Sequence, residues 1–131
     1  MEIGLELEAL TERILGCAIQ VQRKLGPGLL ESTYQACLAH ELRKAGISVE
    51  SEVMLDLQYD ELLIERAYRL DLLIEGKVVV ELKTLDRLLD VHQAQLQTYL
   101  RFSNHRLGLL LNFWRWPLKD GGIKRVINPH T

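Results

Sequence analysis

Apolar side chains recur at every third or fourth position over residues 7–25 of the chain. The positions concerned are Leu10, Ile14, Cys17, Val21 and Leu25. This spacing places them on one face of an amphipathic helix. The Gly-Pro-Gly sequence at 26–28 is expected to end this helix, because proline lacks a backbone N–H and glycine permits unusual backbone angles. A second helix is predicted over residues 30–45, with Gly46 as its C-terminal cap.

The period of the pattern changes to two after these helices. Residues 49–59 alternate between apolar and polar side chains, which predicts a half-exposed strand. A turn at 59–61 and two further strands, over 66–74 and 78–83, are expected to follow. The last two strands are joined by residues 75–77, whose central glycine suits a tight hairpin connection.

One more helix and two more strands are predicted in the rest of the chain. The helix is expected over residues 91–102, with Asp90 as its N-cap and Gln93 completing a capping box. Residues 107–113 are apolar almost throughout, which predicts a strand covered on both faces. A short final strand is expected over 123–127, after a glycine pair.

The predicted order of elements is therefore ααβββαββ. This order indicates an α/β (α+β) fold with a mixed β-sheet of about five strands flanked by helices. The third strand, the third helix and the fourth strand together form a parallel crossover. Because no linker or repeat interrupts the pattern, residues 1–131 are expected to form a single domain.

Charge is distributed unevenly although the net charge of the chain is only −2. Residues 1–65 hold five Lys or Arg against twelve Asp or Glu, a net of −7. Residues 66–131 hold eleven against six, a net of +5. A polyanionic ligand is therefore expected to bind the second half of the chain.

Other features of the sequence indicate a cytoplasmic protein without a membrane anchor. No apolar run approaches the length of about 20 residues that spans a bilayer. The beginning of the chain is acidic, unlike a signal peptide. Cys17 and Cys37 lie among apolar residues without metal-ligand spacing, which indicates two reduced, buried thiols.

Charged residues within the predicted strands suggest a site. Glu81 and Lys83 point to one face of their strand, yet they follow the apolar run 78–80, so they need partners. Asp71 lies ten residues before Glu81 on the preceding strand. An odd number of connecting residues places Asp71 on the face of Glu81, and an even number places it opposite. A type I turn with a bulge at Gly76 has three connecting residues, which brings the two carboxylates together.

Two carboxylates beside a lysine suit a hard divalent cation such as Mg²⁺, which prefers oxygen ligands. Such an ion lowers the pKa of bound water and neutralises charge on a phosphoryl oxygen. Lys83 is expected to orient the attacking water or to stabilise the developing charge. The alternative is a structural role, in which Glu81 and Lys83 form an ion pair at the end of a strand.

A sequence of motifs along the chain resembles one known family. Gly28, Glu31 and Tyr34 match the signature of the GxxExxY family, a bacterial and archaeal group of the PD-(D/E)XK nuclease superfamily. The resemblance extends over nearly the whole chain. Its other parts are the Gly26-Pro27-Gly28 turn, the 41–46 segment, Asp71 with Glu81-Leu82-Lys83, the 95–100 segment, the 108–113 segment and residues 123–125.

The resemblance implies a restriction-endonuclease-like core and a set of site residues. Asp71 and Glu81 correspond to the metal-binding carboxylates, with the carbonyl of Leu82 as a further ligand, and Lys83 to the catalytic lysine. Glu31 corresponds to an acidic residue that completes the metal site from an early helix. Gln95 corresponds to a residue that supports the substrate phosphate or the lysine. The chain departs from the superfamily pattern in having Leu70 where the name has proline.

Several of these residues also have structural interpretations. Glu31 suits the positive end of a helix dipole, and Tyr34 suits core packing as well as a supporting role in the site. Tyr99 lies with His92 and Gln95 on one helical stripe, which either faces the substrate or is structural. Arg87, Lys124 and Arg125 are the candidate phosphate contacts, with solvated charge as the alternative.

Two functions remain open from the sequence. The first is a nuclease that hydrolyses phosphodiester bonds of DNA or RNA with Mg²⁺ or Mn²⁺, using Asp71, Glu81 and Lys83. The second is a non-catalytic module of the same fold that binds nucleic acid or a protein partner. The complete Asp-Glu-Lys set favours the first. Nucleic acid is the expected partner, no membrane is expected to be involved, and the oligomeric state stays open, with a homodimer among the options.

Overall fold

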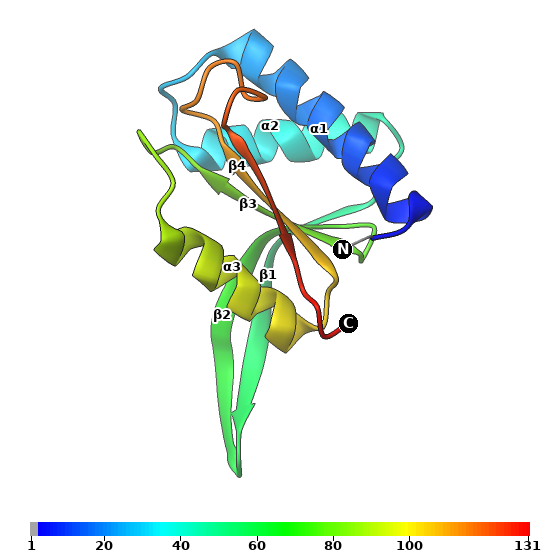
Figure 1. Ribbon diagram of the computed structural model, residues 1–131, viewed down its shortest axis with the longest axis vertical. Helices are drawn as coiled ribbons and strands as arrows, with labels where there is room; N and C mark the ends of the chain where they lie inside the picture. Colours follow the sequence, from blue (N-terminus) through cyan, green and yellow to red (C-terminus); the bar gives the residue numbers. More distant parts are fainter. Residues whose placement is uncertain (1–2) are drawn as a thin grey trace.

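The protein has the predicted order of elements in the computed structural model, which describes residues 3–131 (Figure 1). Two helices come first, and a five-stranded mixed sheet with a third helix follows, so the α+β fold class is confirmed. The elements in chain order are α1 (Leu5–Leu25), α2 (Glu31–Lys44), β1 (Val49–Tyr59), β2 (Leu62–Ile74), β3 (Val78–Lys83), α3 (Asp90–Ser103), β4 (Leu107–Asn112) and β5 (Ile123–Ile127).

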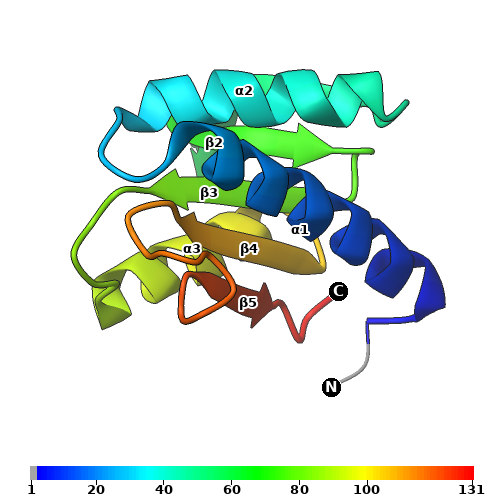
Figure 2. The same ribbon diagram turned by 90° about the horizontal axis from the view of Figure 1, so that it is seen from above.

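The strands lie side by side in chain order, from β1 to β5. Neighbouring strands are antiparallel except β3 and β4, which are parallel and are connected through α3. Figure 2 shows α1 and α2 on one face of the sheet and α3 on the other. Because helices cover both of its faces, β4 is buried along its whole length, as its apolar sequence predicts.

Each face of the sheet has its own apolar core. The core under α1 and α2 is the larger one, and Tyr34 stacks on Phe113 within it, with ring centroids 4.7 Å apart. The core under α3 is built around Leu96 and Leu100 of that helix and Val79 of β3. Cys17 and Cys37 are free thiols, but both are half-buried at the edge of the larger core rather than fully buried.

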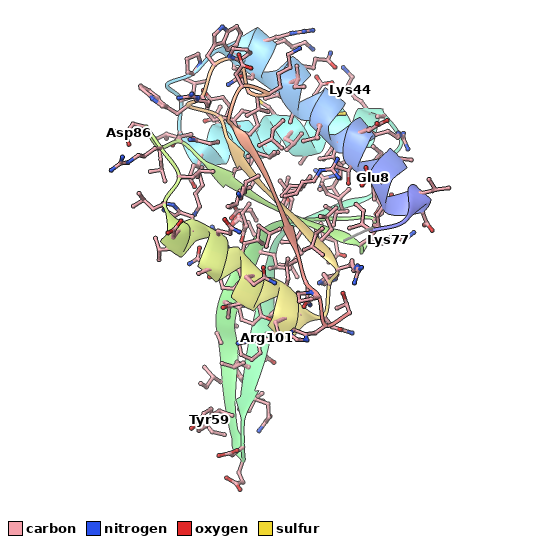
Figure 3. All side chains as sticks on the ribbon, viewed as in Figure 1. Glu8, Lys44, Tyr59, Lys77, Asp86 and Arg101 are labelled. Atoms are coloured by element: carbon pink, nitrogen blue, oxygen red, sulfur yellow. The ribbon has the colours of Figure 1, made fainter. Side chains whose placement is uncertain are left out.

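The β1–β2 hairpin projects from the body of the protein, with Tyr59 close to its tip (Figures 1 and 3). The expectation that the second strand begins at residue 66 is wrong, since β2 begins at Leu62. Cross-strand pairs such as Leu57 with Ile64 extend the ladder outward, so that two residues, 60 and 61, form the turn. Arg66 interrupts the ladder with a φ of 53°, and its N–H is bound by the Asp56 carboxylate.

The start of α3 also differs from the expectation. The helix begins at Asp90, so Leu89 rather than Asp90 is the residue before the first turn. His92 takes the position three residues after Leu89, and its Nδ1 accepts a hydrogen bond from the Leu89 N–H at 2.9 Å. The expected capping box with Gln93 is therefore not formed. The side chain that binds the N–H of the residue before the helix is His92, one position earlier than Gln93.

Two buried amide side chains fix the loops at the carboxyl end of the β3–β4 pair. Gln22 of α1 donates to the carbonyls of Phe113 and Arg115 and accepts from the N–H of Leu118. Asn112 binds both the N–H and the carbonyl of Leu85, at 3.1 Å and 2.8 Å. These bonds hold the connections on either side of the sheet end in defined positions. Within residues 3–131, no helix is both long and apolar enough to cross a membrane.

Candidate active site

The hairpin between β2 and β3 determines where the two central carboxylates lie. Its ladder pairs Ile74 with Val78 and ends with Leu72 opposite Val80, so three residues connect the strands. The expected odd number is thus present, although the turn is not type I. Glu75 has a φ of 54° and Gly76 one of 64°, so two successive residues adopt left-handed angles.

Beyond the pair of Leu72 and Val80, hydrogen bonds to side chains replace the backbone hydrogen bonds between β2 and β3. The N–H of Asp71 donates to Oε2 of Glu81 at 2.9 Å, and the N–H of Leu82 donates to Oδ2 of Asp71 at 3.0 Å. Each carboxylate therefore binds a backbone N–H at the opposite strand, where β2 turns away from β3. The reciprocal bonds bring Asp71 and Glu81 together, as the count of connecting residues requires.

The electrostatics of this pair are strongly perturbed. Glu81 is only 6% exposed. Burial, followed by the nearby charge of Asp71, raises the pKa of Glu81 to about 9, and the weaker effect of Lys83 opposes that rise. The pair therefore retains a proton at neutral pH when no cation lies between the carboxylates.

The carboxylates face α3. Burial raises the pKa of Tyr99 on that helix, and the charges of Glu81 and Asp71 raise it further. Tyr99 in turn packs on Tyr68 of β2, with ring centroids 4.9 Å apart. The structure thus brings Tyr99, one of the predicted supporting residues, to the carboxylate pair. Gln95 is exposed one helical turn before Tyr99, on the same side of α3.

Lys83 lies two residues beyond Glu81 on β3 and is half-buried. Its positive charge lowers the pKa of Glu81, against the larger effects of burial and of Asp71. On the neighbouring strand, Asn112 lies opposite Lys83 in the parallel register. The three predicted central residues, Asp71, Glu81 and Lys83, therefore form one electrostatic group.

Arg69 is a member of this neighbourhood that the sequence interpretation missed. Its guanidinium lies 3.4 Å from Oδ1 of Asp71 and 3.2 Å from Oε1 of Glu52. Arg69 could have been found from its position two residues before Asp71, because residues two apart on a strand share one face. Arg69 neutralises part of the Asp71 charge from the solvent side.

The residues of the GxxExxY signature belong to α2 and to the turn before it. Glu31 is the first residue of α2, on the sheet face opposite α3, and it is half-buried. Over the described residues, 3–131, no three His, Cys, Asp or Glu side chains gather as a set of metal ligands. Tyr34 is fully buried, and its hydroxyl donates to the carbonyl of Gly26 and accepts from the N–H of Leu29. The Tyr34 hydroxyl therefore stabilises the turn before α2, which favours a role in core packing over a role in the site.

The three predicted phosphate contacts divide between the two faces. Arg87 and Lys124 line one cavity of about 360 Å³ at the carboxyl end of β3 and β4. Arg125 instead lies opposite Leu109, a residue of the core under α1 and α2, and its guanidinium binds Glu8 of α1 at 2.9 Å. The expectation for Arg125 is thus wrong for a site on the α3 face, because adjacent strand residues point to opposite faces.

Comparison with known proteins identifies the family. The sequence profile described as the PD-(D/E)XK nuclease superfamily matches residues 8–126. The chain belongs to this superfamily. No curated protein matches the sequence. A solved structure named "Crystal structure of SSO0001" has a TM-score of 0.56 and 23% sequence identity, and the match covers 76% of this chain and 50% of that one. This chain thus spans about half the length of that structure, whose similarity shows the fold.

Proposed function

We propose that this superfamily member is a divalent-metal-dependent nuclease of the GxxExxY group, with Asp71, Glu81 and Lys83 as its central residues. The observation that carries the proposal is the pairing of Glu81, 6% exposed and with its pKa raised to about 9, with a second carboxylate. Ionising both carboxylates of such a pair is costly for the fold, because burial disfavours charge and like charges repel. A bound cation relieves both costs.

The donor chemistry fits Mg²⁺ or Mn²⁺. Asp71 and Glu81 would hold the ion, and the Leu82 carbonyl and Glu31 are proposed as further ligands. When bound, a divalent ion supplies charge neutralisation at a phosphoryl oxygen and a more acidic water molecule. Lys83 would place a positive charge beside the scissile phosphate. Gln95 and Tyr99 would support the substrate or the lysine from α3.

A non-catalytic role is the second candidate, and the bonding of the carboxylates favours it. Asp71 binds the Leu82 N–H and Arg69, and Glu81 binds the Asp71 N–H. These bonds stabilise the separating strands without any metal. A chain that had lost catalysis would still need both carboxylates for this purpose, and it would bind nucleic acid or a protein without cutting.

Cleavage assays with three variants separate the two functions. The assay measures Mg²⁺- or Mn²⁺-dependent cutting of a mixed panel of DNA and RNA by wild type, Asp71→Asn, Glu81→Gln and Lys83→Met. We expect metal-dependent cutting by wild type and its loss in all three variants. Glu65→Gln, which changes an exposed carboxylate on the projecting hairpin, is the matched control. Cutting that is equal in every variant would exclude this site as its source.

Metal binding by the same variants distinguishes the role of the lysine. Lys83 carries the same sign of charge as the metal and cannot bind it while protonated. Lys83→Met is therefore expected to abolish cutting and to keep metal affinity, whereas Glu81→Gln should lose both. Equal loss of metal affinity in the two variants would make Lys83 a structural residue.

A further inference from the structure

A cavity beside the carboxylate site has the lining of an anion-binding pocket. It has a volume of about 360 Å³ and lies between the β3–α3 connection, the start of α3, and strands β4 and β5. Three exposed cations, Arg87, Arg115 and Lys124, come to it from three different segments. The predicted phosphate contacts included Arg87 and Lys124 but not Arg115.

The three cations are available to a ligand. Across residues 3–131, no ion pair to a carboxylate involves Arg87, Arg115 or Lys124. Two carboxylates, Asp86 and Asp90, also line the cavity, so the formal charge of its lining is +1. Asp86 lies on the outer part of the β3–α3 connection (Figure 3). A charge of +1 suits a single phosphate group better than a polyphosphate.

The loops that carry the two arginines are held in place. The paired bonds from Asn112 to Leu85 fix the connection that continues into Arg87. Gln22 binds the carbonyl of Arg115, and the Arg115 Nε donates to the Asp120 carbonyl at 2.8 Å. Bonds to Nε leave the two terminal nitrogens of a guanidinium free to donate to two oxygens of a phosphate group.

Glycine is required beneath this arginine. Gly121 has a φ of 89°, and a Cβ there would lie 3.2 Å from the Arg115 Nε. At Gly122 a Cβ would come within 2.5 Å of the Leu118 carbonyl oxygen. Gly121 thus lets the β4–β5 connection pass close under the Arg115 side chain, and Gly122 lets it pass close to the Leu118 carbonyl. The fixed backbone lowers the entropy that a ligand must offset on binding.

The cavity and the carboxylates share one face of the sheet. Glu81 lies opposite Leu110 on β4, and Leu110 lies opposite Lys124 on β5. Two strand spacings therefore separate Glu81 from Lys124, which corresponds to roughly 10 Å. The start of α3 adds partial positive charge at the cavity wall.

We propose that this cavity binds a phosphate group of the nucleic-acid strand, through Arg87, Arg115 and Lys124, next to the phosphate that the carboxylate site acts on. This assignment rests on the proposed nuclease function and adds a second phosphate subsite to it. The subsite fixes the strand across the β4 end of the sheet. It therefore acts on binding and leaves the chemistry to Asp71, Glu81 and Lys83.

Binding measured without metal tests the subsite separately from cleavage. The probes are short fluorescent single-stranded DNA and RNA, in EDTA, with the wild-type chain, Arg87→Gln, Arg115→Gln, Lys124→Gln and the triple variant. Each single change is expected to weaken binding of the probe that wild type prefers several-fold, and the triple change at least about 30-fold. The slope of log affinity against log salt should fall by roughly 0.7 for each phosphate that is no longer neutralised.

Arg125→Gln and Arg23→Gln are the matched controls. Arg125 adjoins Lys124 but points to the opposite face, and Arg23 lies on the exposed side of α1. Both should bind like wild type, and Arg115→Lys should recover part of the lost affinity. Thermal unfolding of each variant verifies that it folds. Equal losses in controls and pocket variants, or absence of binding by wild type, would overturn the subsite.

Two further measurements distinguish a strand phosphate from a free phosphate, and separate failure of the subsite from failure of the nuclease proposal. Thymidine monophosphate bound as tightly as the strand would overturn assignment of the cavity to a strand phosphate. Asp71→Asn should bind the strand at least as tightly as wild type in EDTA, because one negative charge beside the phosphate is removed, and it should lose cleavage. Cleavage by wild type with unchanged binding in the triple variant would refute the subsite alone. Pocket-dependent binding without any metal-dependent cleavage would refute the nuclease proposal alone.

Discussion

The two faces of the sheet contrast in how they use polar groups. On the α1–α2 face, the buried polar groups Gln22 and Tyr34 each bind backbone atoms of loops within the core. On the α3 face, Glu81 lies buried beside a second carboxylate, with a pKa raised to about 9. The polar groups of the first face therefore only stabilise the fold, while the second face holds a pair of carboxylates whose full ionisation is unfavourable. Such an arrangement is typical of functional sites.

The largest expected effect is the loss of stability when a core side chain under α1 and α2 is shortened, without any loss of metal affinity. Leu38 is fully buried on α2, under the face without the carboxylates. Leu38→Ala should lower the free energy of unfolding by about 2–5 kcal/mol, because it leaves a cavity. Chemical denaturation measures this loss. Metal affinity of the folded variant should equal that of wild type, and a parallel loss of affinity would show that the faces are coupled.

The next effect is the pH dependence that Glu81 imposes on stability. The pKa of Glu81 is raised from 4.5 to about 9 by folding, so between these values the folded chain holds a proton that the unfolded chain has released. Its stabilising contribution is complete below pH 4.5 and is lost as the pH rises toward 9. The free energy of unfolding should therefore fall between pH 7 and 9, by up to about 1.4 kcal/mol per pH unit.

Glu81→Gln is the control for this pH dependence, because glutamine has no proton to lose. Its unfolding free energy should be nearly constant over the same range. His105 does not interfere, because burial lowers its pKa from 6.5 and it is already neutral above pH 7. A wild-type slope unchanged by the substitution would assign the pH dependence to another group.

A smaller effect is expected from the hydroxyl of Tyr34. Tyr34→Phe keeps the ring stacked on Phe113 but removes the bonds to Gly26 and Leu29. The expected loss is about 1–2 kcal/mol of unfolding free energy, because each of the two hydrogen bonds usually contributes about 1 kcal/mol or less. Hydrogen exchange should rise at the Leu29 amide and stay unchanged at the Leu82 amide. A change in cleavage larger than the change in stability would give Tyr34 a role in the site.

Much of the fold and part of the site were predictable from local patterns. The alternation along β3 and the three residues between β2 and β3 were enough to place Asp71 beside Glu81. Alternation also determined that Lys124 and Arg125 point to opposite faces, a consequence that the sequence interpretation did not draw. Short-range periodicity is informative here because it depends only on backbone geometry.

The remaining features depend on contacts between distant parts of the chain. The bonds of Gln22 connect residues more than 90 positions apart, and no local pattern predicts them. The outward extension of β2 from Leu62 follows from pairing with β1 rather than from its own sequence. The position of Arg115 at the cavity depends on packing of the β4–β5 connection, for the same reason.

Calorimetric titration of the protein with Mn²⁺ tests most directly whether Asp71 and Glu81 hold a divalent cation on the α3 face. The measurement at pH 7, in buffers of different ionisation enthalpy, counts the protons released per bound ion. Because the pair holds a proton at this pH, we expect one site that releases about one proton, with affinity rising toward pH 9. Glu81→Gln should bind no ion there. Absence of saturable binding at both pH values, or equal affinity in Glu81→Gln, would contradict a cation site at this pair.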